Sequence, residues 1–137
     1  MTIDKRNELV FQGHIIDSYK RCGGHARKWA TELMVGMPDL ICALPGWGVH
    51  LVEVKHRPEW RLGRDYPNPM TDKQRYEAGL YRNGGGRALG FVVVGSEKAL
   101  GSSLVVFDPL LPQIQLVRSV YYVPGNKYNI NDLLGAA

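Results

Sequence analysis

Three charged residues lie in a part of the chain that otherwise has the composition of a protein core. Asp39, Glu53 and Lys55 fall within the run "GMPDLICALPGWGVHLVEVK". The apolar stretches on either side of the Pro-Gly turn predict the two strands of a hairpin. Successive side chains of a strand point to opposite faces, so Glu53 and Lys55 share a face. In a hairpin, Asp39 falls opposite the end of the second strand, where two carboxylates and an ammonium group then converge.

This set of side chains suits the hydrolysis of phosphodiester bonds. Hard cations such as Mg²⁺ bind oxygen ligands, often one or two carboxylates together with waters and substrate phosphate. A cation held in this way can activate water and neutralise charge on a phosphate, and a neighbouring lysine can orient that water. The alternative is an ordinary salt bridge of Lys55 with Glu53 or Asp39, since most surface ion pairs do no chemistry. The spacing between Pro38-Asp39 and the second strand favours the metal site.

Composition favours one basic domain in a reducing compartment. The chain has 137 residues, of which 45% are hydrophobic and 22% charged, and a net charge of +4. A pI near 9.2 is a mild indication of polyanionic partners. Cys22 and Cys42 form no C-x-x-C motif, so the sequence indicates neither a disulfide framework nor a zinc site. We expect a cytoplasmic protein of a bacterium or a phage-infected cell, with no signal peptide and no membrane segment.

Periodicity predicts a mixed α/β domain around these residues. A helix is expected over residues 3–22, ending at Gly23-Gly24, and a second over 71–85, starting with a T-x-x-Q capping box. Residues 56–70 hold three prolines and are expected to form a long loop. The other expected elements are strands at 26–33, 39–45, 49–55, 88–95, 103–109 and 113–123, and a short helix at 129–137.

The ordered motifs resemble a known nuclease family. Pro38-Asp39 and Glu53-Val54-Lys55 match the PD-(D/E)XK motif, and the longer string "GMPDL…PG…VEVK…T-x-x-Q" resembles its VRR-NUC branch of stand-alone phage and bacterial nucleases. The resemblance covers about residues 8–96 and implies a restriction-endonuclease-like fold. We therefore expect a single domain over 1–137, with an α-β-β-β-α-β core in 1–100 and a strand-rich extension in 101–137.

The resemblance also implies roles for the residues of the motif. Asp39 and Glu53 would bind Mg²⁺ or Mn²⁺, with the backbone carbonyl of Val54 as a further ligand. Lys55 would position the attacking water. The family usually adds an acidic residue from the first helix to this set.

The first helix offers Glu8 for that role. With residues placed at about 100° intervals, Glu8 lies near the centre of the apolar face formed by Phe11, Ile15 and Tyr19. A carboxylate buried there costs free energy unless it is paired, hydrogen-bonded or bound to a metal. The alternative is an exposed first turn, in which Glu8 only interacts favourably with the helix dipole. We expect Glu8 to complete the metal site.

Two glutamines are further candidates. Gln12 lies one turn after Glu8 on the same side of the helix, where it either orders the site or is a polar edge residue. Gln74 is the third residue of the second helix, and a capping box with Thr71 would explain it alone. The resemblance implies a glutamine that faces the active site, so Gln74 joins the predicted catalytic set.

Basic and aromatic residues after the motif are candidates for DNA contact. Arginine neutralises phosphates, and aromatic rings stack on exposed bases. The alternative is a solvated lid whose arginines pair with Glu59 and Asp65. Tyr66 lies in the same loop. The predicted DNA-binding residues are Arg57, Arg61, Arg64, Trp60, Arg27 and Lys28.

These expectations combine into a metal-dependent DNA endonuclease. The favoured substrate is branched DNA, as cut by Holliday junction resolvases in recombination, and a symmetric junction suggests a homodimer. Strands at 104–107 and 115–123 either form its interface or extend the core sheet. Other hypotheses are a catalytically inactive DNA-binding module of the same fold, a flap or nicking nuclease, and a restriction-type nuclease.

Overall fold

Two helices and eight strands make up the described part of the chain. The computed structural model describes residues 3–29, 36–95, 102–115 and 119–122, together with Ile130 and Leu134. The helices are α1 (Ile3–Arg21) and α2 (Asp72–Asn83). The strands are β1 (His25–Lys28), β2 (Leu40–Leu44), β3 (Gly48–Arg57), β4 (Asp65–Pro67), β5 (Ala88–Val94), β6 (Ser102–Phe107), β7 (Gln113–Gln115) and β8 (Ser119–Tyr122).

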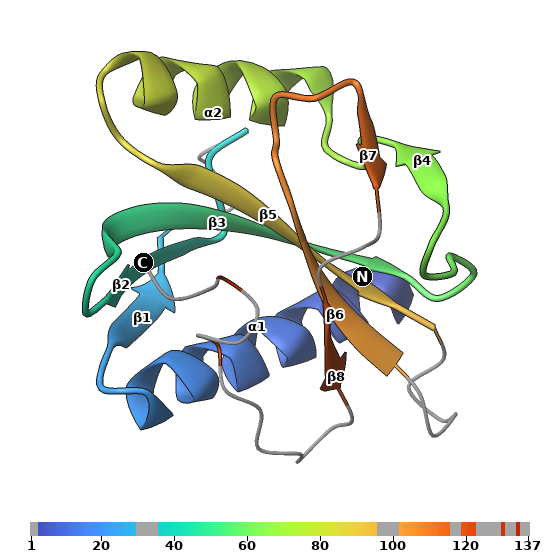
Figure 1. Ribbon diagram of the computed structural model, residues 1–137, viewed down its shortest axis with the longest axis horizontal. Helices are drawn as coiled ribbons and strands as arrows, with labels where there is room; N and C mark the ends of the chain where they lie inside the picture. The colour runs from blue at the N-terminus through green and yellow to red at the C-terminus, as the bar shows by residue number, and fades with distance from the viewer. Residues whose placement is uncertain are drawn as a thin grey trace.

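The predicted α/β class is confirmed. Six strands form one sheet in the order β1-β2-β3-β5-β6-β8, with α1 on one face and α2 on the other (Figure 1). The β3–β5 pair is parallel and the other neighbours are antiparallel, so the sheet is mixed. Neither helix of the described chain has the length and apolar character needed to cross a membrane.

The segment 56–70 is not the simple loop that its prolines suggested. Strand β3 continues to Arg57, and β4 forms a second, two-stranded sheet with the distant strand β7. The prediction was wrong here because a strand partner so far along the chain leaves no local pattern. Part of the strand expected at 26–33 and almost all of the helix expected at 129–137 lie outside the described residues.

The β2–β3 hairpin sets the position of the candidate site. Its turn uses Gly46 and Gly48, whose φ angles of 84° and 70° favour glycine. Leu40 pairs with Val52, and there β2 begins, whereas β3 continues for five more residues. On its other edge β3 stays paired with β5 as far as Arg57. Over its second half, β3 therefore has no partner strand on the edge that β2 occupies in the first half.

The two faces of the sheet have separate cores. The α1 face packs Phe11, Ile15 and Tyr19 against alternate residues of the central strands, including Val52 and Val54. Ile130 and Leu134 are buried in the same cluster. By strand alternation Glu53 and Lys55 lie on the other face, under α2.

The α2 face has a smaller apolar core that includes Met70, Val92 and Phe107. The ring of Phe107 covers its cross-strand partner Gly90, where it occupies the space that a Cβ would need. Leu104 and Val105 of β6 are also fully buried between β5 and β8. Residues 104–107 therefore extend the core sheet.

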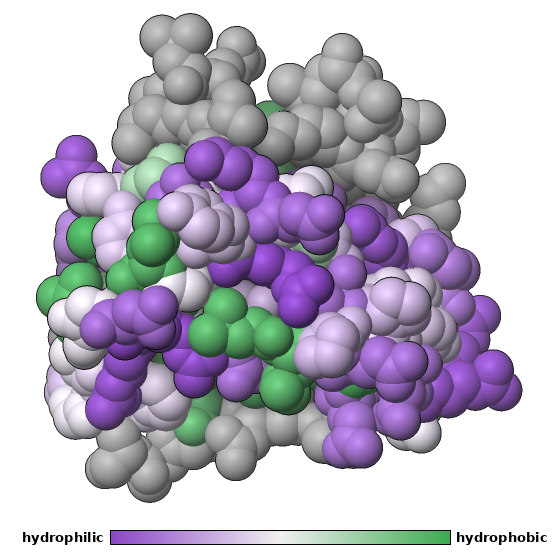
Figure 2. All heavy atoms as spheres, turned by 90° about the horizontal axis from the view of Figure 1, so that it is seen from above, coloured by the Kyte–Doolittle hydropathy of each residue, from purple (hydrophilic) through white to green (hydrophobic). Residues whose placement is uncertain are grey.

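The outer surface on the α2 side is mostly polar, with a smaller apolar area among the polar atoms (Figure 2). Leu80, Leu110 and Leu111 are exposed hydrophobic residues, and Leu110 lies beside α2 at Gly79.

The first turn of α2 has the predicted capping box, in which the Thr71 hydroxyl accepts a hydrogen bond of 3.1 Å from the backbone N–H of Gln74.

Candidate active site

Because β2 begins at Leu40, the second half of β3 has no backbone partner on that edge, and the Asp39 carboxylate takes the place of one. The register of the hairpin places Asp39 opposite Glu53. Its Oδ2 accepts a hydrogen bond of 2.8 Å from the backbone N–H of Val54. A buried amide without an acceptor would be costly, so this bond fixes the carboxylate at the edge of β3. The structure thus brings Asp39 to the end of β3 that the hairpin pattern predicted.

Glu53 is a buried carboxylate with two polar neighbours. Only 3% of the residue is exposed. Its Oε1 accepts a 2.9 Å hydrogen bond from Gln74 Nε2 and lies 3.6 Å from Lys55 Nζ. Its Oε2 is buried and has no hydrogen-bond partner among the described residues. Burying this oxygen costs free energy, and the neighbouring Asp39 carboxyl, with which a protonated Glu53 can share a hydrogen bond, or a bound cation can offset that cost.

Gln74 links the second helix to this carboxylate. The Oε1 atom of its amide accepts from the Thr71 backbone N–H at 2.9 Å, which leaves the NH₂ group to donate to Glu53. The capping box and the contact with the site are therefore not alternatives. One side chain does both, and the cap holds the amide in the orientation that the site requires.

The proton affinity of Glu53 is unusually high. Burial is the main cause that raises its pKa to about 8, and the nearby Asp39 carboxylate adds to the effect. The Lys55 ammonium group acts in the opposite direction, and the charge of Glu8 raises the pKa further. If all three carboxyl groups were ionised they would repel one another, and a bound cation would relieve that repulsion.

Glu8 reaches the site from the opposite side of the sheet. Its side chain is only 12% exposed, and Oε2 lies 4.0 Å from a guanidinium nitrogen of Arg57. Gln12, one turn further along α1, is buried. The structure thus places Glu8 near the second half of β3, where its charge acts on Glu53. Sequence reasoning missed its contact with Arg57, which no local pattern signals.

The aromatic residues after the motif stack on each other. The rings of Trp60 and Tyr66 are 4.3 Å apart and nearly parallel, at 3°. The Tyr66 hydroxyl accepts from the backbone N–H of Arg61, so the stack orders the loop. Because Tyr66 already covers one face of Trp60, the predicted stacking of Trp60 on a DNA base would need its other face. The guanidinium of Arg57 lies 5.9 Å from the centre of that ring.

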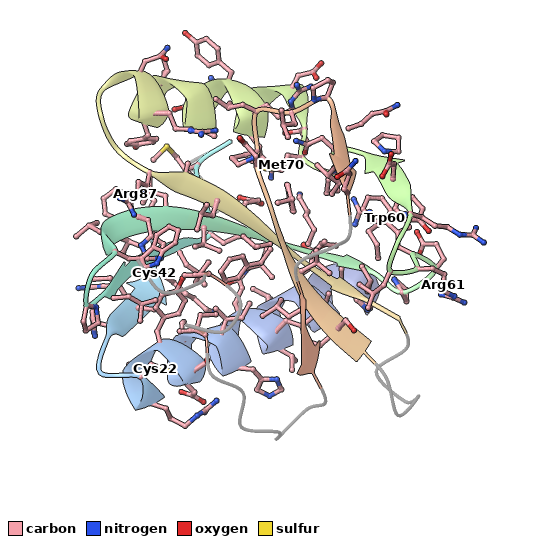
Figure 3. The ribbon with its side chains drawn as sticks, viewed as in Figure 1. Cys22, Cys42, Trp60, Arg61, Met70 and Arg87 are labelled. Atoms are coloured by element: carbon pink, nitrogen blue, oxygen red, sulfur yellow. The ribbon has the colours of Figure 1, made fainter. Side chains whose placement is uncertain are left out.

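Arg61 and Arg64 are exposed, as a contact with DNA requires. Figure 3 shows Arg61 at the outer edge of the molecule beside Trp60. Neither Glu59 nor Asp65 forms an ion pair with these arginines within the part of the chain that the structure describes. The lid held by such pairs, which was the alternative interpretation, is therefore not observed.

Arg27 and Lys28 lie on the edge strand β1 and are exposed. Lys28 pairs with Leu40, and the backbone N–H of Trp29 donates to the Asp39 carbonyl at 2.9 Å. The end of β1 therefore lies next to the backbone of Asp39. This places Lys28 closer along the sheet to the carboxylates than Arg27 is.

The oxygens at the N-terminal end of β2, beside the middle of β3, fit a hard divalent cation. Asp39 and Glu53 provide two carboxylates, and the Val54 carbonyl points to the same edge of β3 as its amide, towards Asp39. In the described ranges no group of three or more His, Cys, Asp or Glu side chains has a metal-binding arrangement. Two carboxylates and a carbonyl form an oxygen-only ligand set of the type that suits Mg²⁺ and Mn²⁺.

Comparison with models of protein families gave no match, and a search of curated proteins found no similar sequence. A functional assignment for this chain therefore rests on the site.

Proposed function

We propose that this protein is a metal-dependent nuclease of the PD-(D/E)XK type that hydrolyses phosphodiester bonds of DNA. The observation that carries the proposal is the half-buried Asp39 and the buried Glu53 beside Lys55, at the point where β2 begins. With β4 of the second sheet left aside, the order is a helix, three strands, a helix and a strand, and this order supports a restriction-endonuclease-like core.

Each residue of the site has a role that its geometry supports. Asp39, Glu53 and the Val54 carbonyl would hold Mg²⁺ or Mn²⁺, which when bound activates water and neutralises phosphate charge. Lys55 is only 11% exposed and lies on the same face as Glu53, so its ammonium group can donate a hydrogen bond to the attacking water and stabilise the negative charge that develops on the phosphate. Gln74 fixes the orientation of Glu53.

The proposed substrate is branched DNA, a four-way junction in the first place, and the proposed assembly is a homodimer. The basic pI and the exposed Arg61 and Arg64 support a polyanionic substrate. These arginines would contact backbone phosphates, which position the nucleic acid without reading its sequence. Flap, nicking or restriction-type cleavage and an inactive DNA-binding module are the outcomes against which the substrate is tested.

The decisive experiment is cleavage of labelled DNA in Mg²⁺, in Mn²⁺ and in EDTA. The panel contains a four-way junction, a splayed arm, a flap, a linear duplex and a supercoiled plasmid. We expect metal-dependent cutting that is lost in Asp39→Asn and retained in Asp17→Asn, a matched control on the exposed side of α1. DNA binding without cutting in either metal would refute the nuclease and support the inactive module.

A further inference from the structure

A cavity of about 440 Å³ lies at the end of the main sheet where β5 begins. It is bounded by the turn between β2 and β3, by the last turn of α2 and by the connection from α2 to β5. Its lining includes Trp47, Arg82, Gly86 and Arg87, together with the first two residues of β5. None of the described residues that line it is acidic. Two arginines and an aromatic ring thus share a cavity with a positive lining.

Arg87 is an exposed cation with a fixed position. Its guanidinium carbon lies 4.8 Å from the centre of the Trp47 ring, which is the geometry of a cation–π contact. Its backbone carbonyl accepts a hydrogen bond of 3.0 Å from the N–H of Leu51 and so is tied to β3. It forms no ion pair within the ranges that the structure describes. A guanidinium in this state is suited to an anion that a ligand supplies.

The last turn of α2 adds a second guanidinium to the cavity. Arg82 pairs with Asp108, and the five N–H donors of a guanidinium allow it to contact another acceptor at the same time. Residues 84–86, between the two arginines, are all glycines and carry no side chains that would fill the cavity. A phosphate group is an anion that arginine binds well, because its oxygens match the donors of the planar fork.

The cavity lies on one side of the candidate metal site along β3. The register pairs Gly90 of β5 with Glu53. Arg87 precedes Gly90 by three residues, which corresponds to about 10 Å along the strand. Figure 3 shows Arg87 and Arg61 at opposite ends of the molecule. An exposed arginine therefore lies beyond the metal site in each direction along β3.

We propose that this cavity receives a backbone phosphate of the DNA substrate, which Arg87 and Arg82 contact from two sides. This inference rests on the proposed function, because it takes DNA as the ligand. At a rise of about 3.4 Å per nucleotide of one strand, this phosphate is about three nucleotides from the phosphate at the metal site. The Trp47 ring holds the Arg87 guanidinium before DNA binds, which lowers the entropy lost on contact.

The alternative is a structural role for the contact between Arg87 and Trp47. The Trp47 ring packs against the core on the α1 face and lies edge-on to His50, with the ring centres 5.8 Å apart. An arginine that only covers this ring would affect stability, and its removal would change DNA affinity no more than the loss of any other surface charge. The test must therefore compare Arg87 with an arginine elsewhere on the surface.

The first measurement is DNA binding by fluorescence anisotropy in EDTA, with a labelled four-way junction at several salt concentrations. Arg87→Gln should weaken binding about fivefold near 0.15 M salt and reduce the slope of log affinity against log salt by about 0.9, as expected for one lost phosphate contact. The matched control is Arg21→Gln, which removes the same charge from the exposed side of α1, on the other face of the sheet. It should change the slope by less than about 0.2.

The second measurement locates the contact on the DNA. Single phosphates in one arm are replaced by uncharged methylphosphonates, one position at a time. The wild type should lose affinity about fivefold at one position, where Arg87→Gln should lose nothing further. Trp47→Leu, which changes no charge, should weaken DNA binding about twofold in the wild type and have no effect in an Arg87→Gln background, since it removes only the support of the guanidinium.

Each outcome bears on the phosphate site or on the nuclease. Equal effects of Arg87→Gln and Arg21→Gln in folded proteins, with a wild type that cuts DNA, would overturn the phosphate site and leave the nuclease intact. A wild type whose DNA binding depends on Arg87 but which cuts no DNA in either metal would support the phosphate site and refute the nuclease. Calorimetric binding of inorganic phosphate that depends on Arg87, with unchanged DNA affinity, would assign the cavity to a free anion and overturn the DNA contact. A wild type that binds no DNA would refute both, and thermal unfolding establishes that each variant is folded.

Discussion

Binding of a divalent cation should release nearly one proton from Glu53 at pH 7. Burial and the neighbouring Asp39 carboxylate raise the pKa of Glu53 to about 8 in the protein without a metal. At pH 7 the side chain is then protonated in about nine molecules out of ten. A carboxylate must lose its proton to bind a metal, so the binding reaction expels it. The expected release is about 0.9 proton per cation at pH 7 and about 0.1 at pH 9.

The affinity for the cation depends on pH because protons and the cation bind the same carboxyl group of Glu53. Protons and the cation compete for Glu53, so the apparent affinity for Mn²⁺ rises with pH and levels off above pH 8. Below pH 8 each unit should cost about tenfold in affinity. An ordinary exposed glutamate would be ionised throughout this range and would give no such dependence. The slope therefore reports the burial of this side chain.

Titration calorimetry measures the release directly. Mn²⁺ is added at pH 7 in two buffers that differ in ionisation enthalpy, and the difference in heat gives the number of protons. Glu53→Gln, which cannot release the proton, is the control. Mn²⁺ binding to the wild type with less than about 0.2 proton released at pH 7 would refute the role of Glu53 as a buried ligand with a raised pKa.

Three further predictions concern single residues. Lys55→Ala should abolish cleavage and keep DNA affinity, as measured by gel retardation, and loss of binding in a folded protein would contradict its catalytic role. Glu53→Gln should raise the unfolding free energy of the metal-free protein by about 5 kcal/mol at pH 9, because ionising a carboxyl whose pKa is raised from 4.5 to about 8 costs about 1.4 kcal/mol for each pH unit between these values. The same change should have little effect at pH 4, and equal denaturant midpoints at pH 9 would argue against it. Burial lowers the pKa of His50 below its usual 6.5, so its stabilising contribution is complete above pH 6.5 and is lost as pH falls further, and His50→Gln should weaken this part of the acid dependence.

His50 shows how a residue without a catalytic role is still fixed by the fold. Its Nδ1 lies 3.0 Å from the Gly48 carbonyl, which requires a proton on that nitrogen. Its Nε2 then accepts from the Tyr19 hydroxyl at 2.7 Å. Protonation of Nε2 would break this buried bond. The histidine therefore ties the C-terminal half of α1 to the hairpin, on the sheet face opposite the carboxylates.

The central part of the site was predictable because its rules are local. The period of two in a strand places Glu53 and Lys55 on one face, and the turn length fixes the register that puts Asp39 opposite Glu53. The capping box of α2 was equally visible in the sequence. These features depend on residues within a few positions of one another or across one short turn.

The remaining contacts depend on parts of the chain that are far apart. The pairing of β4 with β7 joins strands on either side of α2 and two strands of the main sheet. The contact between Glu8 and Arg57 depends on where α1 crosses the sheet. The stack of Trp60 on Tyr66 depends on the turn between them. Composition showed that these residue types were present, and only the fold determines which of them meet.

β2 begins only at Leu40, and this late start explains why the proposed chemistry can occur beside Val54. Pro38 lies opposite Val54 in the extended register, and proline has no N–H with which to continue the ladder. The chain then turns towards α2, where Gly36, with φ of 84°, leaves room for the side chain of Lys73. The Asp39 carboxylate accepts the hydrogen bond of the Val54 amide in place of a neighbouring strand. The Val54 carbonyl, on the same edge of β3, remains an acceptor beside it. A β2 strand two residues longer, with a residue other than proline at position 38, would pair with both backbone groups of Val54 and leave no oxygen there for a cation, so the break in the sheet is a condition for the proposed site.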